Sequence, residues 1–210
     1  MKNKKTLIVI ILVFALVVGG AAVLYNRLGK ENAPEQLVTQ TPEQTDESKS
    51  DENTADESQA DDTQTNETEA KIQTPDFVVY DADGNEVRLS DYFGKPIVLN
   101  FWASWCGPCQ MEMPDFNEKF LALGEEVNFL MVNLTDGSRE TVEKASAFVT
   151  EKGYSFPVLY DTQSEAATTY GVYSIPTTYF IDSDGYVVTQ ASGAIDGDTL
   201  QRGIDMILPK

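Results

Sequence analysis

Two cysteines, Cys106 and Cys109, are the residues best suited to chemistry, and the chain of 210 residues has no others. They follow an apolar run, 97–102, and precede a segment with helical character, 110–123. At the N-terminus of such a helix, unpaired N–H groups and the helix dipole stabilise the Cys106 thiolate and lower its pKa. Cys109 then lies one turn further along on the same face, where it can close a disulfide. The spacing therefore predicts one nucleophilic thiol and one that resolves a mixed disulfide.

The two residues between the cysteines fit this interpretation. Gly107 allows close approach of a partner backbone, and Pro108 suits a first helical turn, where its missing N–H costs little. A structural disulfide is the first alternative, but so short a loop restricts the unfolded chain least. A metal pair is the second, but the chain has no histidine and no further thiol to complete a site. We expect neither a metal nor a cofactor.

Composition excludes other function classes. Without histidine, serine–histidine and cysteine–histidine catalysis are impossible, and Gln110 after Cys109 rules out haem attachment through C-x-x-C-H. The net charge of −19 makes nucleic acid a poor partner. Thirteen acidic residues and one lysine lie within 31–70, and twenty-one acidic against nine basic residues lie within 71–210. The first thirty residues contain no acidic residue at all. These shifts divide the chain into segments.

The N-terminal segment has the features of a membrane signal-anchor. Residues 6–26 carry no charge, and three lysines precede them. At about 1.5 Å per residue such a helix spans roughly 30 Å, enough for a bilayer core. The lysines favour a cytoplasmic N-terminus, residues 1–5. A cleaved signal peptide with the small residues 19–22 at its cleavage site is the alternative. Both interpretations place the rest of the chain outside the cytoplasm, at the cell membrane if the single-pass anchor is retained.

Residues 27–71 have the composition of an acidic linker. Apart from Leu37 and Val38, the stretch from residue 31 contains almost nothing to bury, so it cannot offset its chain entropy. We expect a disordered, self-repelling tether that spans some 35 Å. Residues 72–210 then form one domain of ordinary size.

The domain shows alternating β and α patterns. An N-terminal β-hairpin is predicted from two short strands around Asp83-Gly84. A helix is expected from Ser138, as its cap, to Lys152. The remaining expected elements are strands at 97–102, 127–134, 156–160, 177–181 and 186–190 and helices at 110–123, 164–170 and 198–208. This order predicts an α/β fold with a mixed central sheet and helices on both faces.

The cysteine motif resembles the thioredoxin superfamily. The resemblance covers about residues 75–210 and rests on Trp105-Cys106-Gly107-Pro108-Cys109 with Pro114. The wider pattern Asn100-Phe101-Trp102-Ala103-Ser104-Trp105, with Glu112, resembles the TlpA/ResA branch, whose domain is of the redoxin or AhpC/TSA type. That branch contains membrane-tethered, extracytoplasmic thiol–disulfide oxidoreductases.

A second motif supports the same resemblance. The segment 171–179, Gly-Val-Tyr-Ser-Ile-Pro-Thr-Thr-Tyr, resembles the family's cis-proline loop. The resemblance implies that the Ile175–Pro176 bond is cis and lies opposite the cysteines. It leaves the Ile175 backbone free to pair with an extended partner chain. A trans proline in an ordinary turn is the alternative.

Two positions depart from related patterns. Cytoplasmic thioredoxins carry a buried aspartate where this chain has Asn100, which cannot move a proton. We hypothesise that Glu112, desolvated and with a raised pKa, takes and returns the proton of Cys109. An exposed helix glutamate is the alternative. Gly107 stands where related proteins often have glutamate, and the Gly-Pro pair is associated with a reducing poise. Of the aromatic residues, Phe101 is assigned to the core and Trp105 to the rim of the site.

The resemblance implies an enzyme that exchanges disulfides with proteins, more as a reductant, in cytochrome c maturation or general extracellular disulfide reduction. Support of a methionine sulfoxide reductase also fits. Its partners would be protein thiols and a membrane or extracytoplasmic electron donor, and we expect a monomer. An oxidative folding catalyst, a peroxiredoxin-like peroxidase and a non-catalytic adaptor are alternatives. The peroxidase is disfavoured because Ala103 replaces the expected threonine and no arginine is nearby.

Overall fold

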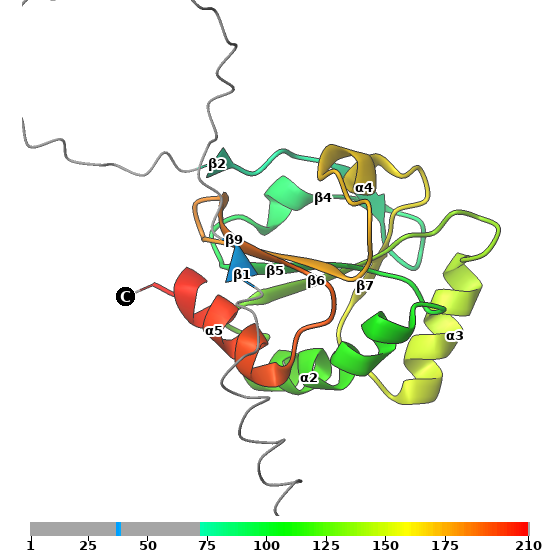
Figure 1. Cartoon of the computed structure of the whole chain (residues 1–210). Coiled ribbons are helices and arrows are strands. Elements are labelled where there is room, and N and C mark those ends of the chain that lie inside the picture. The colour runs from blue at the N-terminus through cyan, green and yellow to red at the C-terminus, as the bar shows by residue number, and fades with distance from the viewer. Residues whose placement is uncertain (1–36, 39–71, 210) are drawn as a thin grey trace, which may run out of the picture. The chain divides into compact units, whose positions relative to one another are not determined.

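A mixed β-sheet forms the centre of the computed structural model, which describes residues 37–38 and 72–209 (Figure 1). Its strands are β1 (Leu37–Val38), β2 (Ile72–Gln73), β3 (Val78–Tyr80), β4 (Glu86–Arg88), β5 (Ile97–Trp102), β6 (Asn128–Asn133), β7 (Val158–Tyr160), β8 (Thr177–Ile181) and β9 (Tyr186–Ser192). The helices are the 3-10 turn η1 (Leu89–Tyr92), α2 (Gly107–Leu123), α3 (Val142–Lys152), α4 (Glu165–Thr169) and α5 (Gly197–Ile207). The strand order is β1-β9-β8-β5-β6-β7-β3-β4, with β2 also paired to β9. The predicted α/β fold is confirmed.

Strand β5 lies in the middle of the sheet because all six of its side chains are buried. It pairs in parallel with β6 and antiparallel with β8. Alternate side chains point to opposite faces, so Val98 and Trp102 join one apolar cluster while Leu99 and Phe101 join the other. The continuous apolar run predicted this burial on both faces. The cysteines follow shortly after the C-terminal end of β5, so they lie beside the middle strands of the sheet and not beside an edge strand.

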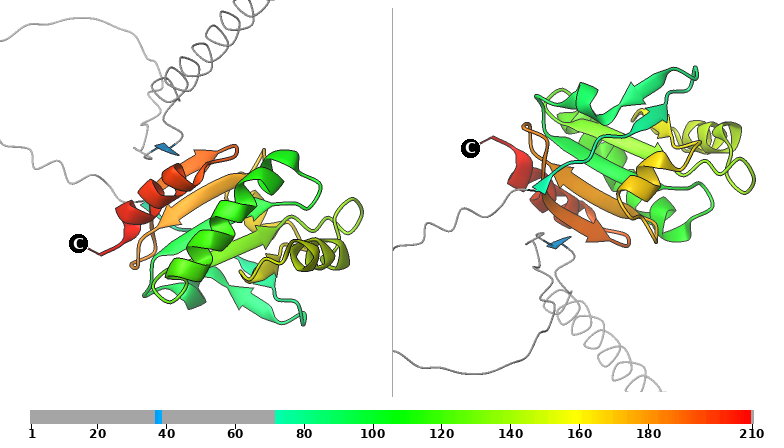
Figure 2. Two further views of the ribbon diagram at one scale, coloured as in Figure 1. Left: turned by 90° about the horizontal axis from the view of Figure 1, so that it is seen from below. Right: turned by 90° about the horizontal axis from the view of Figure 1, so that it is seen from above.

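Helices cover both faces of the sheet. The first face packs against α2, α3 and α5, which lie in front of the sheet in the left view of Figure 2. The second face packs against α4 and η1, and the β3–β4 end of the sheet adds Val79 and Val87 to its apolar cluster. Helix α5 is strongly amphipathic, with Leu200, Ile204 and Ile207 buried. Its Gly203 lies directly against the Phe180 ring of β8.

Helix α3 begins later than the sequence predicts. It starts at Val142, and its N-cap is Thr141, whose hydroxyl accepts from the Lys144 N–H at 3.3 Å. The expected cap, Ser138, instead donates its N–H to the Asp136 carboxylate at 2.7 Å. The same carboxylate oxygen accepts from the Glu140 N–H, so Asp136 closes a turn over residues 136–140. That turn holds the chain out of the helix until Thr141.

Two short segments pair with β9. Leu37 and Val38 pair with Ala191 and Gln190, although the sequence predicts a disordered linker there. Half-buried Leu37 packs against the first apolar cluster, which explains why this apolar pair is ordered. Strand β2 pairs with the other end of β9.

The predicted segments 1–5 and 6–26, and the linker apart from Leu37–Val38, lie outside the described residues. None of the helices that the structure does describe has both the length and the apolar character needed to cross a membrane.

Candidate active site

The cysteine pair lies at the start of α2, just after the connection from β5. After Trp102 a three-residue connection leads to Cys106, the N-cap of α2, and Pro108 occupies the first helical turn. The Cys106 Sγ accepts a hydrogen bond from the Cys109 N–H at 3.2 Å. Cys106 therefore stands at the positive end of a 17-residue helix, as the spacing predicts.

The two sulfurs form a disulfide, with the Cα atoms 5.2 Å apart. Cys106 is 4% exposed and Cys109 is fully buried. The neighbouring Gly107 and Pro108 are both exposed. Apart from Cys106, Pro108 and the nearby backbone of α2, no atom comes within 4 Å of the place where a Gly107 Cβ would lie. Of the two cysteines, only Cys106 can be reached by a partner protein, which would approach over the exposed backbone of Gly107 and Pro108.

The loop before β8 lies against the cysteine pair. The Ile175–Pro176 bond is cis, which confirms the expectation drawn from the family resemblance. The carbonyl oxygen of Ile175 lies 3.6 Å from the Cys106 Sγ. Ile175 is half-buried and Pro176 is buried, while Tyr173 in the same loop is 99% exposed. This loop thus forms one wall beside the reactive sulfur.

Glu112 lies inside the protein, one helical turn beyond Cys109, and is 1% exposed. One carboxylate oxygen accepts from the Asn100 side-chain amide at 2.8 Å, and the other accepts from the Ile195 N–H at 3.0 Å. Burial raises the pKa of Glu112 to about 7; the two hydrogen bonds oppose that rise, and Asp115 adds to it. An exposed helix glutamate is therefore excluded, and the group is poised to exchange a proton near neutral pH.

Aromatic residues around the pair fall into the expected classes. Phe101 and Trp102 are fully buried in the two apolar clusters, whereas Trp105 is 41% exposed. The arrangement offers an apolar rim for a partner chain and no enclosed aromatic box.

Two residues at the site were not anticipated from the sequence. The Arg139 guanidinium lies over the Trp105 ring, with its Cζ 3.5 Å from the ring centroid, a cation–π contact. The expectation that no arginine is nearby is therefore wrong. Glu140 is fully buried and binds Ser104 through both carboxylate oxygens. Both residues come from the loop between β6 and α3, more than thirty positions from Ser104 and Trp105. Local spacing around the cysteines carries no signal for them.

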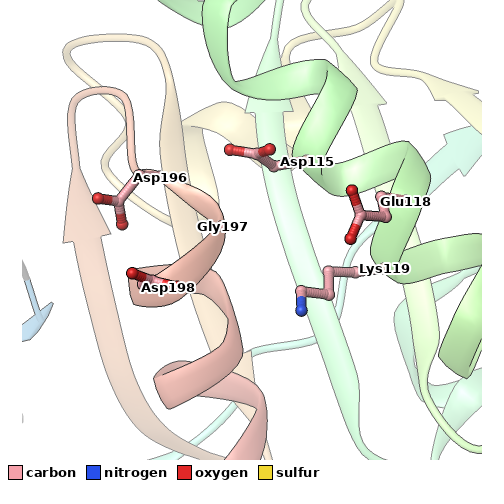
Figure 3. Close-up of a pocket in the computed structure, with 6 residues that line it drawn as sticks. All are labelled: Asp115, Glu118, Lys119, Asp196, Gly197 and Asp198. Atoms are coloured by element: carbon pink, nitrogen blue, oxygen red, sulfur yellow. The ribbon is translucent and has the colours of Figure 1, made fainter.

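A separate pocket of about 350 Å³ opens between α2 and the start of α5 (Figure 3). It is lined by Asp115, Glu118, Lys119, Asp196, Gly197 and Asp198. Four of the six lining residues are acidic, so the pocket is negatively charged. Across residues 37–38 and 72–209 no cluster of side chains suited to binding a metal ion occurs.

Known proteins resemble this chain in sequence. A family model described as the AhpC/TSA family matches residues 71–190. The thiol-disulfide oxidoreductase ResA of Geobacillus kaustophilus is 39% identical over 136 residues, which are 64% of this chain and 76% of that protein.

Solved structures resemble it as well. A crystal structure of a putative thiol:disulfide interchange protein DsbE from Chlorobium tepidum superposes with a TM-score of 0.59 at 31% identity, over 66% of this chain and 97% of that one. The exposed lipoprotein thioredoxin of Streptococcus pneumoniae gives a TM-score of 0.53 at 36% identity, over 62% of this chain and 98% of that one.

Proposed function

Because this chain belongs to the AhpC/TSA family and is a thiol–disulfide oxidoreductase, we propose that it reduces disulfides of proteins outside the cytoplasm. The observation that carries the proposal is the difference between the two sulfurs. Cys106 lies at the N-cap of α2 beside exposed backbone, and Cys109 is fully buried behind it. An attacking thiolate and a protected resolving thiol need this arrangement.

The reaction begins from the reduced pair. The Cys106 thiolate attacks one sulfur of a partner disulfide, a mixed disulfide forms, and the partner's other sulfur leaves as a thiolate that takes up a proton. The Cys109 thiolate then attacks the Cys106 sulfur, closes the internal disulfide and releases the partner's second thiol. Two electrons and two protons pass from the pair to the partner. A dithiol donor in the membrane or outside the cytoplasm must reduce the pair again.

Glu112 supplies the proton transfer at the second step. Cys109 has no access to solvent, so its proton needs an internal acceptor. Glu112 lies one turn away on the same helix, and its pKa of about 7 lets it accept that proton and give it up again. Asn100 cannot do this work, but its amide orients the Glu112 carboxylate.

The partner chain would dock on the surface around Cys106. Gly107 and Pro108 leave the approach open, and Trp105 provides an exposed aromatic edge. Ile175 and Pro176 form the opposite wall, where the Ile175 backbone can pair with an extended polypeptide.

The uncharged segment 6–26 supports a place at the outer face of the membrane, held by a single-pass anchor. The likeness to an exposed lipoprotein thioredoxin is consistent with such a location. We propose that the catalytic domain works there as a monomer.

Trapping tests the proposal directly. In Cys109→Ser the second step is blocked, so mixed disulfides between Cys106 and partner proteins should accumulate and disappear on adding dithiothreitol. The double variant with Cys106→Ser is the matched control and should trap nothing. Absence of any trapped protein with Cys109→Ser would refute exchange with proteins and favour an adaptor. A wild-type pair found oxidised in growing cells, with partners losing thiols, would refute the reductant role in favour of oxidative folding.

A further inference from the structure

Glu140 is a fully buried carboxylate that the proposed reaction does not use. One of its oxygens accepts from the Ser104 N–H at 2.9 Å and from the Asn133 side-chain amide at 2.8 Å. The other accepts from the Ser104 hydroxyl at 2.7 Å. Burying a carboxylate is costly unless it is hydrogen-bonded, and these three donors offset that cost.

These contacts join the loop between β6 and α3 to the connection that precedes the cysteines. Ser104 is two residues before Cys106, and Glu140 binds both its backbone and its side chain. Arg139, the neighbour of Glu140, lies over the ring of Trp105. One loop therefore holds two consecutive residues of the connection through different kinds of contact, hydrogen bonds at Ser104 and a cation–π contact at Trp105.

We propose that Glu140 is a positioning residue for disulfide exchange, which holds Ser104 so that the Cys106 sulfur stays at the N-cap of α2. In that place the sulfur accepts a hydrogen bond from the Cys109 N–H at 3.2 Å and lies at the positive end of the helix. In the reduced protein both features stabilise a thiolate. The role in exchange rests on the proposed function, whereas the effect on the thiol does not.

Two substitutions separate hydrogen bonding from mere occupancy of the site. In Glu140→Gln the side-chain oxygen can still accept from Ser104 and Asn133, and the new amide can donate to the Ser104 hydroxyl. Glu140→Ala removes all three hydrogen bonds, so Ser104, in the connection of residues 103–105 between β5 and α2, is no longer held by the loop between β6 and α3. The Cys106 sulfur then leaves the N-cap more readily, so its thiol pKa rises and less thiolate is available at neutral pH.

The experiment uses the full chain with its cysteines reduced. The Cys106 thiol pKa is read from the pH dependence of its alkylation, and exchange from the rate of insulin disulfide reduction. In Glu140→Ala we expect a thiol pKa higher by about one, hence about tenfold less thiolate below that pKa. The more basic thiolate is about threefold more nucleophilic, so exchange should be about three- to fourfold slower. In Glu140→Gln both readouts should stay within about twofold of wild type.

A general loss of stability is controlled by Val79→Ala, which opens the apolar cluster on the other face of the sheet and should leave the thiol pKa unchanged. If Glu140→Ala does not fold, Ser104→Ala removes the hydroxyl bond alone and should raise the thiol pKa by a smaller amount. An unchanged thiol pKa in the folded variant, or equal deficits in the alanine and glutamine variants, would overturn the proposal. A wild-type protein that reduces no protein disulfide would overturn the proposed function instead, while alkylation would still decide the role of Glu140.

Discussion

The side-chain amide of Asn100 donates a 2.8 Å hydrogen bond to the carboxylate of Glu112, in the interior between β5 and α2. The same amide nitrogen donates to the Thr178 hydroxyl on β8 at 3.0 Å. The strand that precedes the cysteines and the helix that carries them are thus joined through the group that we assign to proton transfer. The Asn100 amide does not titrate, so of these two buried side chains only Glu112 can bind or release a proton.

Replacing Glu112 by glutamine should slow exchange while keeping the fold. Glutamine has nearly the same shape but accepts no proton, so Cys109 loses its internal base. We expect a rate of insulin reduction roughly 100-fold lower, at the lower end of what general acid–base catalysis contributes. The wild-type rate should rise with pH through about 7, and the variant should keep only the part of that rise that comes from ionisation of Cys106. Glu118→Gln, an exposed site on the same helix, is the control. Equal rates for Glu112→Gln and wild type would contradict the assignment.

The pKa of Glu112 also predicts a pH dependence of stability. Burial raises it from an ordinary value of 4.5 to about 7, so the folded protein holds this proton more tightly than the unfolded chain does. The corresponding stabilisation is complete below pH 4.5 and is lost as the pH rises through 7, by about 3 kcal/mol in total. The free energy of unfolding of wild type minus that of Glu112→Gln, from urea titrations, should therefore fall between pH 4.5 and 8. A difference that stays constant over this range would show that Glu112 titrates normally.

Gly107 should tolerate a side chain and thereby tune the cysteine pair. Apart from the adjacent residues and the nearby backbone of α2, a Cβ at this position would meet no atom within 4 Å, so Gly107→Glu should change stability by less than about 0.5 kcal/mol. Its negative charge next to Cys106 disfavours the thiolate, and we expect a thiol pKa higher by about 0.5 and a reduction potential about 15 mV more negative. Gly107→Ala separates the charge from the added carbon. The same shift in both variants would assign the effect to the backbone instead of the charge.

The packing of α5 makes a prediction about stability alone. Alanine normally favours a helix over glycine by about 1 kcal/mol, but a Cβ at Gly203 would overlap the Phe180 ring. Overpacking should win, with a net loss of about 1–3 kcal/mol in urea unfolding. Asp205→Ala, at an exposed site of the same helix, should change stability by less than about 0.5 kcal/mol. A stabilised Gly203→Ala variant would mean that α5 can move away from β8.

The parts of the fold that were predictable are those with local causes. The apolar run of β5, the Asp83-Gly84 hairpin and the cysteines at a helix start all follow from neighbouring residues. Glu112 was accessible to prediction because its spacing from Cys109 places both on one helix face. Its burial depends on Asn100 and Ile195, which lie far away in the sequence.

What the sequence did not reveal depends on distant partners. Ser138 is a residue type that often caps helices. Its N–H instead donates to the Asp136 carboxylate in a turn, and the helix begins only after Thr141, which is its N-cap. Glu140 looks like one more acidic surface residue until Ser104 is placed beside it. The apolar pair at residues 37–38 is too short to predict a strand without knowing that an edge of β9 is available.

Both short strands at the start of the described residues pair with β9, and this affects the free side of that strand. Leu37–Val38 is held opposite residues 190–191, and Ile72–Gln73 is held opposite residues 186–187 of the same strand. Val38 and Ile72 therefore lie opposite Gln190 and Val187, three positions apart on one strand. The two short strands cover residues 186–187 and 190–191 on this side of β9, which leaves no continuous run of β9 residues on which the sheet of another molecule could extend.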